Sequence, residues 1–400
     1  MLKTDMLRAA DRTNRRHFLK AASVTAAGFW VAGGVSSRAQ DSANERLRMA
    51  SIGIGGKGGS DSSDAASHGD MVAVCDVDKG RLAGALKRFP KAKGYTDFRE
   101  MLDKMGRSID AVTVSTPDHM HAPASLMAMR MGIHCFCQKP LTRTIYEARL
   151  VGQVARENKL ATQMGNQGTA GDSLRRSAHW LKNGAIGTVR ELHIWTDRAK
   201  GWWPQGVARP APSTPPAHLP WDLWLGVAPT RPYARGYHPF VWRGWWDFGT
   251  GALGDIACHV VSMPFMGLDL RDPISAVAET SGHNKDSFPE WSIITFEFAA
   301  AAARPAVKLV WYDGGKLPPK ELLGGRDPSP KGGSLAIGDK GILLGDQLLD
   351  GGEPVDVEFP HSPGHFQEWI RAVKGGEQAM SNFPDYAGPL TETMLLGNLA

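Results

Sequence analysis

Lys139 occupies a place in this sequence of 400 amino acids that favours chemistry on a small molecule. It follows the short apolar segment 134–137, a predicted strand, and it precedes Pro140, which ends the strand because proline has no N–H group to donate. Open α/β sheets bind their ligands at the carboxyl ends of the strands. A lysine at such an end is therefore a candidate catalytic cation, and a solvated surface charge is the ordinary alternative.

Asp255 and His259 form a second candidate pair. They follow a glycine-rich turn at 249–251 and are spaced i and i+4, so they share one face of the helix predicted over 252–266. An imidazole held by a carboxylate can act as a general base near neutral pH. The alternative for this pair alone is an aspartate that caps the helix and a histidine that packs in the core.

A third polar group, Asp118, His119 and His121, follows the strand predicted over 109–115. Polar side chains at that edge of a parallel sheet point into the crevice where a cofactor binds. A capping turn before the helix predicted over 122–131 explains Asp118 and His119 equally well.

Strands and helices alternate through the first part of the chain. The strands are predicted over residues 47–54, 71–77, 109–115, 134–137 and 160–164. The helices are predicted over residues 61–68, 79–89, 122–131 and 145–158. This alternation is typical of a parallel, doubly wound sheet, so the fold class is α/β with a first domain over 46–168.

The pattern changes in the second domain, predicted over 169–400. A helix over 172–183 and a strand over 189–196 precede a long loop over 199–246. Strands then follow without intervening helices, over residues 274–279, 292–298, 306–311 and 335–344, before a helix over 365–373. Successive strands of this kind indicate an antiparallel or mixed sheet in an α+β domain.

Gly53, Gly55 and Gly58 fit the pattern G-x-G-x-x-G between a predicted strand and a predicted helix. Glycines in this pattern allow a tight turn and a close approach of the backbone to a pyrophosphate at the helix N-terminus. Asp76 ends the next predicted strand about 20 residues further on, where an acidic residue meets the adenosine ribose. A carboxylate there repels a 2′-phosphate, so the pattern predicts a Rossmann domain that binds NAD rather than NADP, a preference that two nearby lysines weaken.

Seven of the 13 tryptophans fall between residues 202 and 246. Flat aromatic faces beside arginine, aspartate and histidine side chains suit the C–H faces and hydroxyls of a sugar. The alternative is a loop held in place by buried tryptophans, which we expect for at least half of them. The substrate-contact residues predicted here and in the groups above are His119, Trp203, Tyr237, Arg243, Trp246, Asp255 and His259.

The N-terminal region has the order of an export signal. Arg15 and Arg16, followed by Phe-Leu-Lys, precede a small-residue apolar run over 21–35 and small residues at 37–39. This order predicts a twin-arginine (Tat) signal peptide over residues 1–39, with an amphipathic or disordered tail as the alternative. We therefore expect export by the Tat machinery to a periplasmic or other extracytoplasmic location.

The formal net charge of +5 belongs to that region. Residues 1–39 hold seven basic and two acidic residues, and the remainder has equal numbers of both, so nothing favours a nucleic-acid partner. No stretch reaches the roughly 18 uninterrupted apolar residues of a membrane-spanning helix, so no stable membrane insertion is expected. Neither C-x-x-C nor zinc-type spacing occurs, so no metal site is predicted. Buried thiols are expected at the four cysteines, Cys75, Cys135, Cys137 and Cys258.

Taken in order, these motifs resemble the Gfo/Idh/MocA oxidoreductases, the family of glucose–fructose oxidoreductase and inositol dehydrogenase. The resemblance rests on the glycine loop, Val-Cys-Asp at 74–76, Thr-Pro at 116–117, Lys-Pro at 139–140 and Gly-Asp-Ile-Ala-Cys-His at 254–259, and it covers about residues 46–400. It implies a second domain with a large open, mostly antiparallel sheet. It also implies a homo-oligomer, a homodimer or homotetramer.

The resemblance also implies roles for single residues. Lys139 matches a lysine that hydrogen-bonds the reacting hydroxyl, and Asp255 and His259 match an acid–base pair in which the histidine takes the hydroxyl proton. Gln138 stands where the family has glutamate, which leaves the tuning of Lys139 open. The cofactor-contact residues predicted by the motifs and the resemblance together are Gly53, Ile54, Gly55, Gly56, Gly58, Asp76, Ser115, Thr116, Pro117, His121, Gln138, Lys139 and Gln167.

Three functions stay open at this point. The first is an NAD(P)-dependent oxidoreductase that acts on a hydroxyl of a sugar, polyol or glycoside with a tightly bound cofactor, since an exported protein finds no free NAD pool. The second is a redox-neutral, NAD-dependent glycosidase that oxidises, eliminates, hydrates and reduces; its further base is His119, Tyr237 or His238. The third is a non-catalytic sugar-binding protein with structural NAD, against which the intact catalytic candidates argue.

Overall fold

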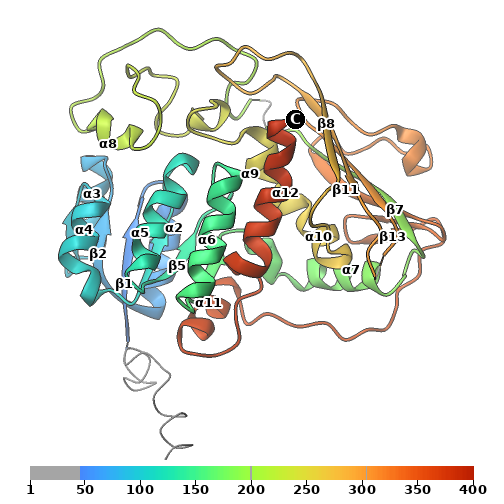
Figure 1. The fold of residues 1–400 in the computed structure, drawn as a ribbon, viewed down its shortest axis with the longest axis horizontal. Coiled ribbons are helices and arrows are strands. Elements are labelled where there is room, and N and C mark those ends of the chain that lie inside the picture. Colours follow the sequence, from blue (N-terminus) through green and yellow to red (C-terminus); the bar gives the residue numbers. More distant parts are fainter. Residues whose placement is uncertain (1–45, 199–200, 303) are drawn as a thin grey trace, which may run out of the picture. The chain divides into compact units, whose positions relative to one another are not determined.

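The computed structural model describes residues 46–198, 201–302 and 304–400, and Figure 1 shows two sheets flanked by helices in this part of the chain. The Tat signal predicted over residues 1–39 lies outside the described residues.

The first sheet is parallel throughout, with the strand order β3-β2-β1-β4-β5-β6. Its strands are β1 (Leu47–Ile52), β2 (Gly69–Cys75), β3 (Lys93–Tyr95), β4 (Ala111–Val114), β5 (His134–Cys137) and β6 (Thr162–Met164). The strand order reverses beside β1, between β1 and β4, and doubly wound sheets bind dinucleotides in the crevice at this point.

Helices cover both faces of this sheet, which explains why its strands are apolar along most of their length. They are α2 (Lys57–His68), α3 (Lys79–Arg88), α4 (Phe98–Met105), α5 (His121–Arg130) and α6 (Ile145–Glu157). A capping box starts α6, since the Thr144 hydroxyl accepts from the Glu147 N–H and the Glu147 side chain accepts from the Thr144 N–H. In α4, three apolar side chains spaced at the helical period are buried, namely Met101, Leu102 and Met105.

The second sheet has the order β13-β12-β11-β7-β10-β9-β8, and only its β7–β10 pair is parallel. Its strands are β7 (Val189–Thr196), β8 (Ser275–Thr280), β9 (Ser292–Phe298), β10 (Val307–Tyr312), β11 (Gly332–Gly338), β12 (Ile342–Leu344) and β13 (Gln347–Leu349). The predicted fold class is therefore confirmed: a parallel, doubly wound domain precedes a domain with a mostly antiparallel sheet.

Six further α-helices follow β6 in the described chain. They are α7 (Asp172–Lys182), α8 (Trp221–Leu225), α9 (Gly251–Val260), α10 (Ser262–Leu268), α11 (His365–Val373) and α12 (Gly388–Leu399). On α11, Phe366 stacks on Phe136 of the first sheet with 4.5 Å between ring centroids, and α12 packs between α6 and α9. The last part of the chain thus returns to the first domain (Figure 1).

Two predicted elements were wrong in extent. The single helix expected over 252–266 is two helices, α9 and α10, that meet at 58°. Pro264 explains the break, because it has no N–H to donate to the carbonyl four residues earlier. The single strand expected over 335–344 is the hairpin β11–β12, since Asp339, Lys340 and Gly341 form a turn.

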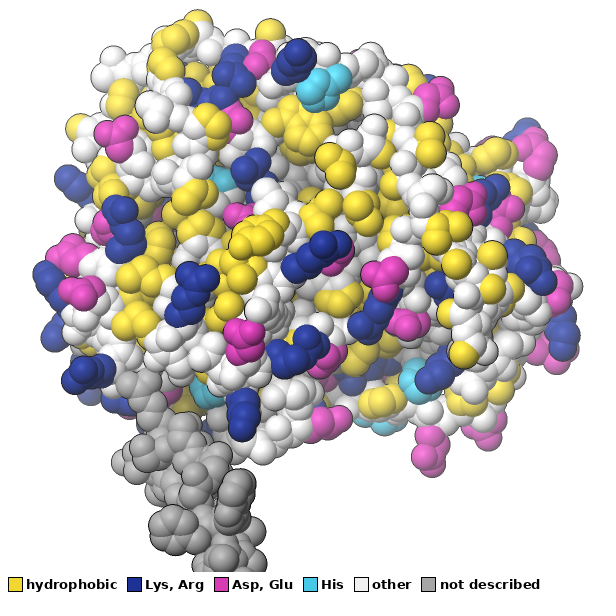
Figure 2. Space-filling view, viewed as in Figure 1, with side chains coloured by type: hydrophobic (Ala, Val, Ile, Leu, Met, Phe, Trp, Pro, Cys, Tyr) yellow, Lys and Arg dark blue, Asp and Glu magenta, His cyan; other side chains and the backbone are white. Residues whose placement is uncertain are grey.

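The surface and the thiols agree with the composition. Figure 2 shows basic and acidic side chains interspersed over one face of the described chain, without a continuous patch of one sign. All four cysteines lie in the described residues and are free and buried, as predicted. Among the described helices no single one is long and apolar enough to cross a membrane, whereas the bent pair α9–α10 meets that test by length and composition alone.

Candidate active site

A cavity of about 730 Å³ lies along the carboxyl ends of the parallel strands. This volume is in the range of sites for cofactors and other small ligands. Its walls come from the glycine loop, from the ends of β2, β4 and β5, from segment 222–243 of the tryptophan-rich loop, and from His259 of α9. Figure 1 shows this loop, with α8, crossing above the ends of the parallel strands, and the Lys79 N–H donates to the His218 carbonyl at 3.0 Å.

The glycine loop has the geometry that a dinucleotide requires. Gly53 has a φ of +76°, which glycine adopts without a steric penalty. A Cβ on Gly58 would lie 2.0 Å from the Gly53 carbonyl oxygen, so helix α2 can pack this closely on β1 only with glycine at that position. The N-terminus of α2 faces the cavity through Gly55, Gly56 and Lys57, and its N–H groups suit a pyrophosphate.

Asp76 is held at the end of β2 by backbone donors. Its two carboxylate oxygens accept from the N–H groups of Ile54 and Asp78, both at 2.9 Å. Burial nevertheless raises the pKa of Asp76. The Arg81 guanidinium packs against Gly55 so closely that a Cβ there would lie 2.3 Å from its Nη1. The end of the cavity beside the glycine loop therefore carries both a carboxylate and a guanidinium.

Lys139 and Asp255 meet at the other end of the cavity. The Lys139 ammonium lies 3.0 Å from Asp255 Oδ1 and donates to the Asp255 backbone carbonyl at 2.9 Å. Arg243 Nε donates to the same Oδ1 at 3.0 Å. Burial alone would raise the pKa of Asp255, but the two cations outweigh burial and lower it. One buried carboxylate thus orients two cations from different segments.

His259 lines the cavity one helical turn beyond Asp255. Burial, with the nearby Lys139 charge, lowers the pKa of His259 to about 4. Its imidazole is therefore neutral at pH 7, which is the form that accepts a proton.

Asp118 lies in the cavity wall and is fully buried. Thr250 Oγ1 donates to its Oδ2 at 2.8 Å, while burial and the Asp255 charge raise the pKa of Asp118 to about 7. His121 also lines the cavity, and its ring nitrogens lie 2.7 and 2.8 Å from the carbonyl oxygens of Pro140 and Thr116. These contacts hold the β4 and β5 ends together.

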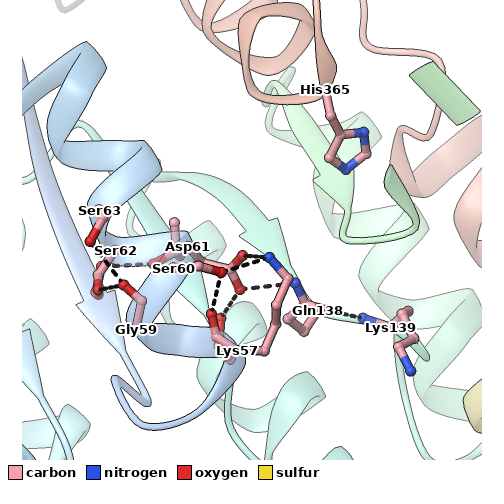
Figure 3. A network of polar contacts seen from close by, with 12 residues as sticks. Lys57, Gly59, Ser60, Asp61, Ser62, Ser63, Gln138, Lys139 and His365 are labelled. Carbon is pink, nitrogen blue, oxygen red and sulfur yellow. Dashed lines mark hydrogen bonds and ion pairs between the residues drawn. The ribbon is translucent and has the colours of Figure 1, made fainter. Parts of the chain in front are cut away.

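Gln138, which stands where the family has glutamate, belongs to a network of hydrogen bonds around Asp61. Its side-chain amide donates to Asp61 Oδ2 at 2.9 Å, and Ser115 Oγ donates to the same oxygen at 2.7 Å. The Lys57 ammonium pairs with Asp61 Oδ1 at 2.6 Å. Figure 3 shows this network between α2 and the strand end that carries Lys139.

The cavity contains most of the predicted cofactor residues. Those that line it are Gly53, Gly55, Gly56, Asp76, Ser115, Thr116, Pro117, His121, Gln138, Lys139 and Gln167. Ile54 and Gly58 lie behind the wall, where Ile54 holds Asp76 and Gly58 packs on Gly53.

The predicted substrate residues divide into two sets. Arg243, Asp255 and His259 belong to the cluster around Lys139. His119, Trp203, Tyr237 and Trp246 are outside the cavity wall. His119 is fully buried between Trp224 and Phe248, with its ring nitrogens at 3.0 and 3.3 Å from their carbonyl oxygens.

The other three side chains of that second set hold the tryptophan-rich loop together. Trp203 donates to Gln205, Trp246 stacks on Phe288, and Tyr237 packs beside Trp221 in a buried aromatic cluster. Five of the seven tryptophans of this loop are buried, as expected for at least half of them, namely Trp203, Trp221, Trp224, Trp242 and Trp245.

Some wall residues were not among the site residues predicted from the sequence. Beside the glycine loop and β3 these are Arg81, Thr96, Phe98 and Arg99, and on the tryptophan-rich loop they are Leu223, Val227, Phe240 and Trp242. Arg81 lies on α3, where no pattern marked it, whereas the other three follow the short strand β3, which lies beside β2 and was not predicted.

Comparison with known proteins places this geometry in a family. Residues 47–166 match the model of the oxidoreductase family with an NAD-binding Rossmann fold, named GFO_IDH_MocA, and residues 184–304 match the model of its C-terminal α/β domain. The two matched segments cover more than half of the chain. The chain belongs to the Gfo/Idh/MocA oxidoreductase family.

Two curated relatives have names that refer to carbohydrate chemistry. Levoglucosan dehydrogenase of Pseudarthrobacter phenanthrenivorans is 25% identical over 207 residues, 52% of this chain and 45% of the relative. Glycosyl hydrolase family 109 protein 1 of a Shewanella species is 30% identical over 183 residues, 38% of this chain and 39% of the relative. This chain spans less than half of the length of these relatives.

Solved structures share the fold at low sequence identity. The WlbA dehydrogenase from Bordetella pertussis, in complex with NADH and UDP-GlcNAcA, has a TM-score of 0.61 at 15% identity and covers 88% of this chain and 94% of its own. Levoglucosan dehydrogenase in complex with NADH and L-sorbose has a TM-score of 0.59 at 16% identity and covers 89% and 97%. The two-domain architecture is therefore common to these proteins.

Proposed function

We propose that this protein is an NAD(P)-dependent oxidoreductase that oxidises a secondary hydroxyl of a sugar, polyol or glycoside. The observation that carries the proposal is the cluster of Lys139, Asp255, Arg243 and His259 in the same cavity as a dinucleotide-type glycine loop. The donor set fits a nicotinamide dinucleotide, because Gly58 leaves no room for a side chain and the first turn of α2 faces the cavity. Relatives named as sugar dehydrogenases support the substrate class.

The residues divide the work in a simple way. A bound nicotinamide cofactor supplies the acceptor for hydride from the carbinol carbon. His259, neutral at pH 7, takes the hydroxyl proton as the C–H bond breaks. Lys139 uses two contacts on Asp255 and keeps a third N–H for the substrate oxygen, where it stabilises the charge that develops as the proton leaves.

Asp255 acts through Lys139 and Arg243. Because Asp255 is buried and ionised, it holds the Lys139 and Arg243 side chains in fixed positions. The products are a ketone and reduced cofactor. We further propose that export by the Tat route takes the folded protein out with its cofactor bound, so that a second carbonyl compound must take the hydride back for turnover to continue. We keep NAD as the expected cofactor and a homodimer or homotetramer as the expected assembly.

One experiment tests the proposal. The full chain is purified, its nucleotide content is identified, and it is incubated with a panel of sugars, polyols and glycosides. We expect ketone formation with some members of the panel and none with Lys139→Ala. Binding of sugars without any ketone, in wild type as in the variant, would overturn the proposal in favour of a sugar-binding protein.

The redox-neutral glycosidase remains a second candidate because a glycosyl hydrolase family 109 protein is 30% identical over its matched segment. Of the three side chains considered for its further base, only His238 lines the cavity. Its Nε2 lies 3.9 Å from Asp78 Oδ2, at the start of α3, and burial lowers the pKa of His238 to about 4. Release of nitrophenol from nitrophenyl glycosides without net reduction of cofactor would favour this reaction over simple oxidation.

A further inference from the structure

We propose that Gln138 and Asp61 are positioning residues for Lys139, and that their buried amide–carboxylate contact ties the strand end that carries the lysine to the helix of the glycine loop. This inference rests on the proposed oxidation, in which Lys139 contacts the substrate. Neither residue touches the reacting atoms in this account. Both act through the backbone turn at the end of β5.

The Gln138 side chain is fixed at both of its ends. Its Nε2 donates to Asp61 Oδ2 at 2.9 Å, and its Oε1 accepts from the backbone N–H of Lys139 at 3.3 Å. Its own N–H donates to the Val114 carbonyl at 2.8 Å. A Cβ at Gly165 would lie 2.5 Å from Gln138 Nε2, so the space for this amide exists only because residue 165 is glycine. The Gln138 side chain therefore has one arrangement in the turn before Lys139.

Asp61 is the acceptor on which the network converges. It is fully buried, and it accepts from Gln138 and Ser115 on Oδ2 and pairs with Lys57 through Oδ1. A buried carboxylate is stable as an anion only when such partners surround it. Because Lys57 opens α2 and lines the cavity, the network joins the cofactor-binding helix to the catalytic lysine (Figure 3).

The chemistry of the contact requires an amide at position 138. A glutamate there would place a second carboxylate at hydrogen-bond distance from Asp61, in a buried site. Two carboxyl groups this close in a buried site cannot both be ionised, so one of them would take a proton or the two side chains would move apart. Either change disturbs the backbone to which Lys139 is attached. The exchanged pair, with asparagine at 61 and glutamate at 138, keeps one contact between an amide donor and a carboxylate. The asparagine oxygen then faces Lys57, and the Ser115 hydroxyl turns to accept from the asparagine amide instead of donating.

The test is this exchange. Gln138→Glu and Asp61→Asn are made singly and together, and kcat and KM are measured with the substrate found for the wild type. We expect each single variant to lose about 10–100-fold in kcat, the usual cost of losing a supporting contact behind a functional group, with a smaller change in KM. The double variant should recover to within a few-fold of wild type, because it restores one donor, one acceptor and one negative charge.

A matched control uses the same chemistry in water. The Gln153 amide donates to Glu157 at 2.7 Å on the exposed face of α6, so Gln153→Glu creates the same like-charge pair outside the site. We expect its kcat to be unchanged. Gln138→Met removes the hydrogen bonds without adding charge, and its kcat loss keeps the test decisive where Gln138→Glu does not fold.

A readout independent of turnover separates this inference from the proposed function. Crystal structures of the variants should show the Lys139–Asp255 contact of 3.0 Å lost in Gln138→Glu and restored in the double variant. An unchanged contact in Gln138→Glu, or a double variant no better than the worse single one, would overturn the inference. A wild type that oxidises no member of the panel would instead overturn the proposed function, and the structures would still decide the role of Gln138.

Discussion

The Lys139 ammonium and the Asp255 carboxylate lie 3.0 Å apart, one at the carboxyl end of β5 and the other on α9, in the two different domains. The ammonium also donates to the Asp255 backbone carbonyl at 2.9 Å, so two contacts with the same residue fix the position of the lysine. This pair is the point at which the domain with the glycine loop and the domain with His259 form one site.

Replacement of Lys139 should separate catalysis from cofactor binding. In Lys139→Ala the donor to the substrate oxygen is lost and Asp255 keeps only Arg243, so we expect kcat to fall by about 100-fold or more. The dissociation constant for NADH, measured by fluorescence, should change by less than about tenfold. Lys104→Ala, which removes an exposed ion pair with Glu100, is the control and should leave both quantities unchanged.

The pH dependence of kcat/KM should report His259. Its pKa is about 4 in the folded protein, and the neutral form is the active base. We therefore expect kcat/KM to fall as the pH drops toward about 4, and His259→Gln to lose that acid limb together with most of the activity. An acid limb that persists unchanged in the variant would assign the titration to another group.

Stability should also depend on buried histidines. Burial lowers the pKa of His119, His121 and His259 to about 4, from an ordinary value of 6.5. Protons then bind the unfolded chain better, so the contribution of these histidines to the free energy of unfolding is fully present above pH 6.5 and is lost as the pH falls through 6.5 toward about 4, by about 1–3 kcal/mol per histidine. Urea unfolding at several pH values measures this loss, and His119→Gln should reduce its size.

Asp76 should control both the cofactor and the loop. Asp76→Ala leaves the buried N–H groups of Ile54 and Asp78 without acceptors, at a cost of about 1–3 kcal/mol each in the free energy of unfolding. Asp76→Asn keeps an acceptor and removes the charge. We expect it to bind NAD more weakly and to lose discrimination against NADP, for which Arg81 supplies a guanidinium. Titration calorimetry with both cofactors measures this ratio, and an unchanged ratio would contradict the role of the carboxylate.

The fold followed from patterns that are local in sequence. Apolar strands that alternate with helices, and a glycine loop after the first strand, predicted the parallel sheet and its crevice. The short strand β3 was not predicted, because three residues of strand carry little periodic signal. The helix α4 was also missed, although Asp97 caps it and its apolar residues have the helical spacing. Pro264 indicates the break between α9 and α10, but the apolar residues around it gave the pattern of one continuous helix.

The site was predictable where a motif places a residue at a strand end. Lys139 was found in this way, and Asp255 and His259 were found from their i and i+4 spacing on a predicted helix; the three meet in the structure. Asp61 was not, because its contact with Gln138 joins residues 77 positions apart and no local pattern marks it. Substrate contacts were predicted at Trp203, Tyr237 and Trp246, which do not line the cavity. Aromatic residues that hold a loop together and aromatic residues that bind a sugar look the same in a sequence.

The most direct test of the central claim is a single turnover of the purified chain with its bound cofactor in the oxidised form, mixed with a sugar or polyol panel and followed by fluorescence of the reduced cofactor and identification of the product. The account predicts ketone and reduced cofactor in equal amounts for wild type. It predicts that both form at least about 100-fold more slowly in Lys139→Ala at the same cofactor occupancy. Equal rates in wild type and Lys139→Ala would contradict it.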